Sequence, residues 1–383
     1  MLPIAKKITP QFAARFFAFG FGFAIALALF ANVTNLRRMD FMSFWAAGKL
    51  TLAGKATDAF DIAVHHQVQA AVVDFEGLMP FAYPPPFLLV VTPFALLPYA
   101  VAAIVWTALT YALYIIGARR FAPSAGWTAA AFPPVLVNGI IAQNGLLTGG
   151  LFVAGMTLLQ RHPVWAGLVL GCLVIKPHLA VLFPLALAAG GHWRAFAGAA
   201  ASSVGLAVIA LLAFGIGAYQ AFIDQMPLFS SIAAEGLVGW HKMASIYASL
   251  RLAGAGPAAA WSAHILIACM AAIAMGLVWR SGAEIEAKAA MLAAASVLIS
   301  PYIYLYDTVL LVLPFVWLAR NGEDPRVLAA LWCIPLIVAL QNWGLNETVN
   351  PAPLLPVAMA ILIWRRLQER RIDARAQAPL PTI

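Results

Sequence analysis

Long apolar runs separated by short polar breaks constrain the fold of this chain more than any other feature. Of its 383 residues, 63% are hydrophobic and only 10% are charged. A helix needs about 20 apolar residues to cross a bilayer, and inside lipid every backbone polar group must find its partner within the protein. The pattern therefore predicts an all-α polytopic integral membrane protein with about 12 membrane helices.

The basic residues predict the orientation of these helices. The net charge is +8, but lysines and arginines lie at the ends of apolar runs, as at Arg119-Arg120 and Arg365-Arg366, and not on one basic face. Cytoplasmic segments of membrane proteins are enriched in lysine and arginine. We therefore expect these ends and both termini in the cytoplasm, and we expect no nucleic acid as a partner.

The apolar runs extend over nearly the whole chain, which predicts one transmembrane domain over residues 1–367. The remaining residues, 368–383, are predicted to form a short disordered cytoplasmic tail. The first outer segment, residues 32–82, has helical apolar spacing over 41–53 and 58–73. Such spacing is typical of helices that lie in the membrane interface.

Two further segments have a predicted form. Residues 163–190 are expected to form a hairpin of two short apolar segments that meet at Lys176-Pro177. After a span over about 195–217, residues 218 to about 250 are expected to form a long loop on the outer side.

Acidic side chains in the first outer segment are candidates for proton transfer. Asp40 lies at the outer end of the first apolar run, where an aspartate can act as a base or simply cap a helix. Asp58 and Asp61 lie near His65 and His66. This group has the composition of a cation site, but the spacing is equally typical of the solvated face of a helix.

Three later polar groups interrupt apolar surroundings. Lys176 lies at the vertex of two short membrane segments, where a lysine is costly and calls for an anionic partner, although lysines also extend to the interface. Gln143-Asn144 is an amide pair that either binds sugar hydroxyls or caps a helix. Asp307 follows several tyrosines at the start of an apolar run and is either a cap or a site residue.

Several enzyme signatures are absent from the sequence. It contains no Gly-x-Ser-x-Gly elbow, Walker loop, dinucleotide-binding glycine motif or His-Glu-x-x-His pair. Chemistry with ATP or NAD is therefore not expected. A site on the outer face would need an activated donor that is soluble in the membrane, and a lipid phosphate suits the outer cations.

The polar motifs, taken in order, resemble glycosyltransferase family 87, whose members are integral-membrane enzymes of the GT-C class. The resemblance covers roughly residues 35 to 320 and rests on Asp40-Phe41, Trp45-Ala46-Ala47-Gly48, Gly54, Phe60-Asp61, Tyr83-Pro84-Pro85-Pro86-Phe87, Gln143-Asn144-Gly145, Lys176-Pro177-His178, Ser300-Pro301-Tyr302 and Tyr306-Asp307. It implies a GT-C-like fold and a hexosyltransferase that acts with inversion on the extracytoplasmic face of a bacterial inner membrane.

The same resemblance implies the substrates. The donor would be a polyprenyl-phosphate-linked sugar, with mannose favoured, and the acceptor a hydroxyl of a lipid or glycan; the other partners would be membrane lipids. No cofactor and no metal ion is expected. The alternative is a transporter or flippase of lipid-linked sugars, but its expected paired halves are not visible as a repeat.

The resemblance also implies roles for particular residues. Asp40 would be the general base on the acceptor hydroxyl. Lys176 would bind the donor phosphate, with Arg37 and Arg38 as further candidates. The candidates for contact with the sugar or the acceptor are Gln143, Asn144, Trp45, Tyr83, His241 and Asp307.

Overall fold

A computed structural model describes residues 9–35, 39–73, 75, 77, 79–123, 125–342 and 349–376. Across these residues every regular element is a helix, in agreement with the predicted all-α class. The elements, with 3₁₀ helices marked η, are α1 (Pro10–Asn35), α2 (Phe41–Leu52), η1 (Ala56–Phe60), α3 (Ile62–Ala70), α4 (Pro86–Val91), η2 (Thr92–Leu96), α5 (Tyr99–Phe121), α6 (Ala125–Ala130), α7 (Pro133–Ile141), α8 (Gly145–Leu158), α9 (Pro163–Gly171), η3 (Cys172–Ile175), α10 (Pro177–Ala180), α11 (Phe183–Ala189), α12 (Trp193–Ala234), η4 (Trp240–Lys242), α13 (Ile246–Leu252), α14 (Pro257–Arg280), α15 (Ile285–Ile299), η5 (Leu305–Leu311), α16 (Val312–Arg320), α17 (Pro325–Asn342) and α18 (Leu354–Ala376).

Four of these helices, α1, α5, α12 and α14, are long and apolar enough to cross a membrane. By the length and composition of these helices the protein is a membrane protein. The predicted count of about 12 spans is not confirmed, because many apolar runs form helices shorter than the roughly 20 residues that a span needs. One of them, α15, is buried along almost its whole length. Short helices of this kind satisfy their backbone groups inside the protein.

Helix α12 extends well beyond its predicted end. It runs over 42 residues, with a break at Gly215, whose φ of 75° and ψ of 167° are not helical. Because glycine lacks a Cβ, it adopts such a backbone without steric cost. The Tyr219 hydroxyl donates to the Ala207 carbonyl across the break (2.7 Å). The predicted outer loop over 218–250 is thus wrong for 218–234, which forms a second helical arm of α12.

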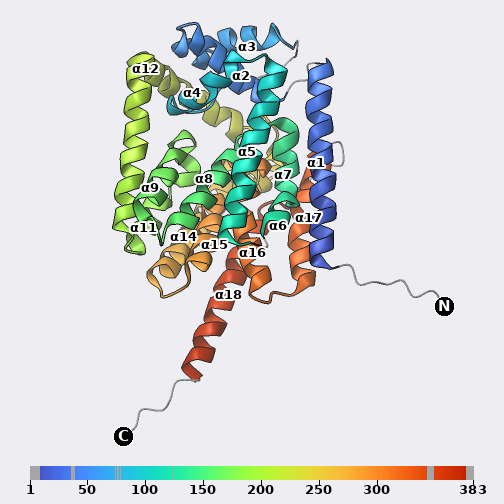
Figure 1. Ribbon diagram of the computed structural model, residues 1–383, viewed down its shortest axis with the longest axis vertical. Helices are drawn as coiled ribbons and strands as arrows, with labels where there is room; N and C mark the ends of the chain where they lie inside the picture. The colour runs from blue at the N-terminus through green and yellow to red at the C-terminus, as the bar shows by residue number, and fades with distance from the viewer. Residues whose placement is uncertain are drawn as a thin grey trace, which may run out of the picture.

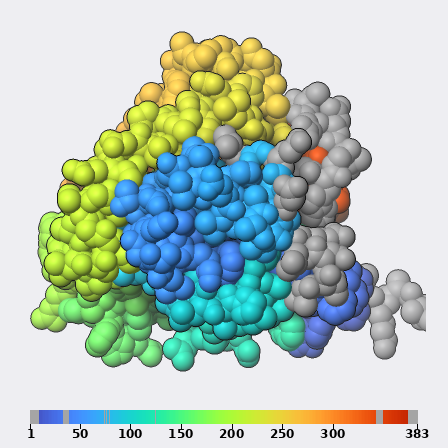
Figure 2. Space-filling model, turned by 90° about the horizontal axis from the view of Figure 1, so that it is seen from above, coloured from blue at the N-terminus to red at the C-terminus, as the bar shows by residue number. Residues whose placement is uncertain are grey.

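The helices that follow Asp40 lie at one end of the molecule. Helices α2, α3 and α4 lie together at the top of Figure 1, and α18 projects from the opposite end. Seen from above, the segment that includes α2 and α3 covers the middle of this end, with the yellow-green arm of α12 beside it (Figure 2). The core beneath α2 is a cluster of aromatic side chains in which Phe41, Phe44, Phe87 and Trp106 are fully buried.

The opposite end is held by ion pairs. The carboxylate of Glu323 accepts from Arg365 (2.9 Å) and from Arg366 (3.1 Å), which anchors the middle of α18. The helix continues to Ala376. The prediction of a disordered tail from residue 368 is therefore wrong for 368–376, where Arg365 and Glu369 form an i,i+4 pair that favours continued helix.

Candidate active site

Asp40 directly precedes α2, at the end of the molecule that carries α2, α3 and α4. Its backbone is the N-cap of α2, but its side chain makes no capping hydrogen bond. The hydroxyl of Tyr99 accepts from the backbone N–H of the preceding residue, Met39 (3.1 Å), and thereby ties this corner to the start of α5. The alternative in which the Asp40 carboxylate serves as a helix cap is excluded.

The Asp40 carboxylate faces the amide of Gln143, which is 103 residues away in the sequence. Gln143 Nε2 donates to Asp40 Oδ2 at 3.4 Å. The Oε1 atom of the same amide accepts from the Tyr83 hydroxyl (3.3 Å) and from the Asn144 backbone N–H (2.7 Å). Three predicted site residues, Asp40, Tyr83 and Gln143, are thus joined by hydrogen bonds.

Lys176 continues this cluster and finds the anionic partner that its position requires. Its ammonium donates to Asp307 Oδ1 at 2.6 Å and to Asn144 Oδ1 at 2.9 Å. Lys176 is 3% exposed and Asp307 is completely buried. The ring of Tyr306 lies 4.9 Å from the ammonium, within the range of a cation–π contact. Snorkelling of Lys176 to the interface is excluded, and Asp307 is an ion-pair partner.

Two phenols near the cluster, Tyr83 and Tyr304, keep their protons. Burial, together with the nearby charge of Asp307, raises the pKa of Tyr83 well above its usual range. Burial and the charges of Asp40 and Asp307 likewise raise the pKa of Tyr304. Both side chains therefore remain protonated at neutral pH.

The turn that carries Gln143 and Asn144 is fixed from within. Asn138, with its amide oriented as its neighbours require, donates to the Gln143 carbonyl (2.9 Å) and accepts from the Gly145 N–H (2.8 Å). Sequence reasoning missed Asn138. An amide inside the apolar run of 133–141 was the available signal, because polar side chains in such runs are seldom without a role.

Replacing Gly145 with alanine is expected to destabilise the protein by about 1–3 kcal/mol. A Cβ on Gly145 would overlap the Tyr306 carbonyl oxygen and the Asn138 amide, so the turn would separate from the segment that carries Asp307. Thermal unfolding in detergent measures the effect. Gly276→Ala is the control, since a Cβ there meets nothing within 4 Å. An equal melting temperature for both variants would contradict the close packing of this turn.

One comparison with known proteins identifies the family of this chain. The sequence model of glycosyltransferase family 87 matches residues 81–301, more than half of the chain. The chain belongs to glycosyltransferase family 87. The protein is therefore a glycosyltransferase. No curated protein and no solved structure matches it.

The matched range contains part of the polar cluster of this glycosyltransferase. Tyr83, Gln143, Asn144 and Lys176 lie within residues 81–301, whereas Asp40 lies outside it. So does Asp307. The hydrogen bonds from Gln143 and Lys176 connect both aspartates to the matched part. We define the polar cluster as Asp40, Tyr83, Gln143, Asn144, Lys176 and Asp307.

Other predicted site residues of the glycosyltransferase lie elsewhere. The indole of Trp45 donates to the Leu97 carbonyl (2.9 Å) and so secures α2 against the start of α5. His241 lies on η4, shortly before the segment in which Ala244 pairs with Ile303 (2.7 Å). The indole hydrogen bond of Trp45 thus goes to Leu97 and not to the polar cluster. Arg37 and Arg38 lie outside the described residues.

The acidic group near His65 does not form a cation site. The Asp61 carboxylate caps α3 by accepting from the Ala63 and Val64 N–H groups (2.9 and 3.0 Å). Burial, and secondarily the neighbouring His66, lowers the pKa of His65 to about 4, so its imidazole is neutral. Among the residues that the structure describes, no three His, Cys, Asp or Glu side chains are placed to hold a metal ion.

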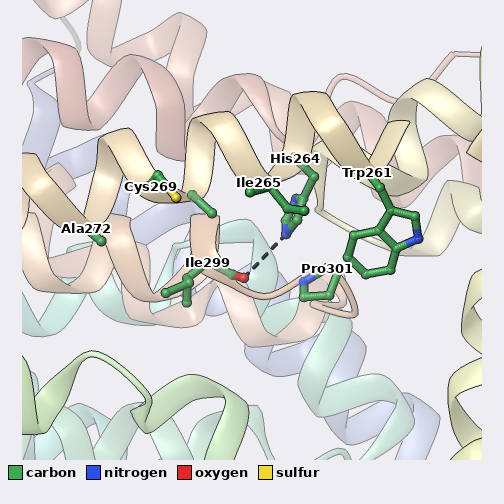
Figure 3. Close-up of a pocket in the computed structure, with 8 residues that line it drawn as sticks. Trp261, His264, Ile265, Cys269, Ala272, Ile299 and Pro301 are labelled. Carbon is green, nitrogen blue, oxygen red and sulfur yellow. Dashed lines mark hydrogen bonds between the residues drawn. The ribbon is translucent and has the colours of Figure 1, made fainter. Parts of the chain in front are cut away.

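A separate pocket of about 270 Å³ lies between α14 and the end of α15 (Figure 3). Trp261, His264 and Cys269 line it from α14, and His264 Nε2 lies 3.3 Å from the Ile299 carbonyl oxygen. Its surface is almost entirely apolar, and it contains no member of the polar cluster. It lacks the groups that catalysis of sugar transfer requires, so the polar cluster is the candidate active site.

Proposed function

We propose that this glycosyltransferase moves a hexosyl group, with mannose favoured, from a polyprenyl-phosphate-linked donor to a hydroxyl of a lipid or glycan acceptor. The observation that carries the proposal is the Asp40 carboxylate, which is not used as a helix cap and belongs to a polar cluster enclosed by apolar helices. A donor with a lipid tail suits a site surrounded by membrane helices and a sequence without nucleotide-binding motifs.

The proposed reaction is a single displacement. Asp40 accepts the proton of the acceptor hydroxyl as its oxygen attacks the anomeric carbon of the donor sugar. The bond from that carbon to the phosphate oxygen breaks, and polyprenyl phosphate leaves with the bonding electron pair. One displacement at the anomeric carbon inverts its configuration. No step is assigned to a metal ion or a cofactor.

Lys176 is proposed to stabilise the departing phosphate. In the described structure its charge is balanced by Asp307. An ammonium has three N–H donors, and Asp307 and Asn144 accept from it at 2.6 and 2.9 Å. One N–H donor is left, but Lys176 is only 3% exposed, so phosphate binding by this side chain requires a rearrangement of the polar cluster when the donor arrives. Arg37 and Arg38 remain proposed contributors because they closely precede Asp40 in the sequence.

The site is proposed to face the extracytoplasmic side of a bacterial inner membrane, within a GT-C-like fold. Support comes from the arrangement of the helices: α2 and α3 lie at one end, and the arginine-rich α18 projects from the other (Figure 1). Basic segments favour the cytoplasm. Asp40, immediately before α2, would then act from the outer face.

Purified protein in liposomes provides the test. We expect radiolabelled mannose to pass from polyprenyl-phosphate-mannose to a component of an added membrane-lipid extract, and we expect no transfer from GDP-mannose. Empty liposomes are the control. Transfer from GDP-mannose alone would overturn the proposed donor. Movement of intact labelled donor across the bilayer, without a new glycosidic bond, would support the transporter instead.

A further inference from the structure

The Gln143 side chain is held in one orientation. Its Oε1 atom accepts from two donors, the Asn144 N–H at 2.7 Å and the Tyr83 hydroxyl at 3.3 Å. Rotating the amide by 180° would place the Nε2 donors against these two donors. The Nε2 group must therefore point away from them, and it meets Asp40 Oδ2 at 3.4 Å.

Both donors that orient Gln143 are themselves rigid. The Tyr83 ring packs against Phe87 and Phe44, with ring centroids 4.8 and 5.4 Å apart. The Asn144 N–H belongs to the turn that the Asn138 side chain fixes on both sides. This turn starts at Ala142, whose φ of 53° is in the left-handed region and which caps α7.

We infer that Gln143 is a positioning residue, which aims the Asp40 carboxylate at the acceptor hydroxyl and is itself oriented by Tyr83. This inference rests on the proposed function, in which Asp40 is the base. A general base must lie within hydrogen-bond reach of the proton that it abstracts. Displacements of about 1 Å can lower turnover about 10²-fold. An amide donor orients a carboxylate without competing for the proton.

The geometry speaks against the sugar-binding role that the family resemblance implies for Gln143. Its side chain is only 7% exposed. The amide oxygen already accepts from two groups, and the amide nitrogen donates to Asp40. A sugar hydroxyl that donates to Oε1 would have to displace one of its two internal donors, and the second N–H of Nε2 belongs to a residue that is only 7% exposed.

The two roles differ in their kinetics. A positioning residue acts in the transition state, so its loss lowers kcat, whereas loss of a sugar contact raises the donor KM. For Gln143→Ala we expect kcat to fall about 10- to 100-fold with little change in the donor KM. Gln143→Glu keeps the size but replaces the donor with an acceptor, and we expect at least the same loss. Gln67→Ala, an exposed glutamine on α3, is the control with unchanged kcat.

The link through Tyr83 is tested by combining variants. Tyr83→Phe removes only the hydroxyl, so kcat is expected to fall about 2- to 10-fold. This factor corresponds to the free energy of one hydrogen bond. In the Gln143→Ala background the same change should have no further effect, because coupled residues are not additive. Unchanged thermal unfolding of Tyr83→Phe would show that the loss is not one of folding.

Three results would overturn the inference. A raised donor KM with unchanged kcat in Gln143→Ala would return this residue to sugar binding. If the effects of the two variants on the activation free energy were fully additive, Tyr83 would not act through Gln143. A fully active Gln143→Ala alongside an inactive Asp40→Asn would remove the positioning role alone, whereas a fully active Asp40→Asn would remove the proposed base as well.

Discussion

Replacing Asp40 with asparagine is expected to lower the rate of sugar transfer about 10²- to 10⁴-fold, the usual contribution of a general base. Asparagine has nearly the same shape, and its Oδ1 still accepts from Gln143 Nε2, so the corner between Asp40 and α2 should be retained. What is lost is the ability to accept the proton of the acceptor hydroxyl. Transfer of radiolabelled mannose from polyprenyl-phosphate-mannose in liposomes is the measurement.

Two controls distinguish chemistry from folding. Asp224→Asn alters an exposed aspartate on the second arm of α12 and should leave transfer unchanged. Asp40→Glu keeps a carboxylate but lengthens the side chain by one methylene group, so partial activity is expected. Wild-type rates for Asp40→Asn would exclude this residue as the base, whatever its position in the polar cluster.

The second large effect concerns the buried ion pair. Lys176→Met leaves the Asp307 carboxylate without its cation at a completely buried position, and Asp307→Leu leaves the Lys176 ammonium in the same state. Breaking a buried pair from one side costs about 3–5 kcal/mol. We therefore expect each single variant to lower the melting temperature strongly in detergent.

The double variant shows whether the loss of stability in each single variant comes from the charge that is left unpaired. Lys176→Met with Asp307→Leu removes both charges, and such replacements are often neutral or stabilising, so most of the stability should return. Glu369→Gln, in a half-exposed pair with Arg366, is the control and should change stability by less than about 1 kcal/mol. Single variants as stable as wild type would contradict the importance of the pair. A stable double variant without transfer activity would assign Lys176 a role in the reaction.

The sequence predicted the helices around the site better than it predicted which side chains contact one another there. The helices after Asp40 and the break between two short helical segments at Lys176 are confirmed, because helical apolar spacing and proline are local signals. The pairing of Lys176 with Asp307 joins residues 131 positions apart. No local pattern specifies such a contact, so the sequence indicated that Lys176 needs an anion but not which one.

The prediction of the number of spans and of the course of α12 was limited in a similar way. Composition predicts that an apolar run is helical but does not show whether the helix crosses the bilayer or is buried among others, as α15 is. The outer loop expected from residue 218 includes Asp224 and Pro227, which lie within α12. The helix continues through both, because the backbone turns at Gly215 and the second arm packs against η1. Tertiary packing decided both features.

The long separation of Lys176 and Asp307 has a consequence for biosynthesis. A ribosome adds about 5–20 residues per second, so Asp307, which is 131 positions after Lys176, is added on the order of 10 s later. During that time the lysine enters apolar surroundings without its counter-ion, at a cost of about 2.5–3.5 kcal/mol near the centre of a bilayer. We therefore expect the segment around Lys176 to reach its final packing only after Asp307 has been synthesised.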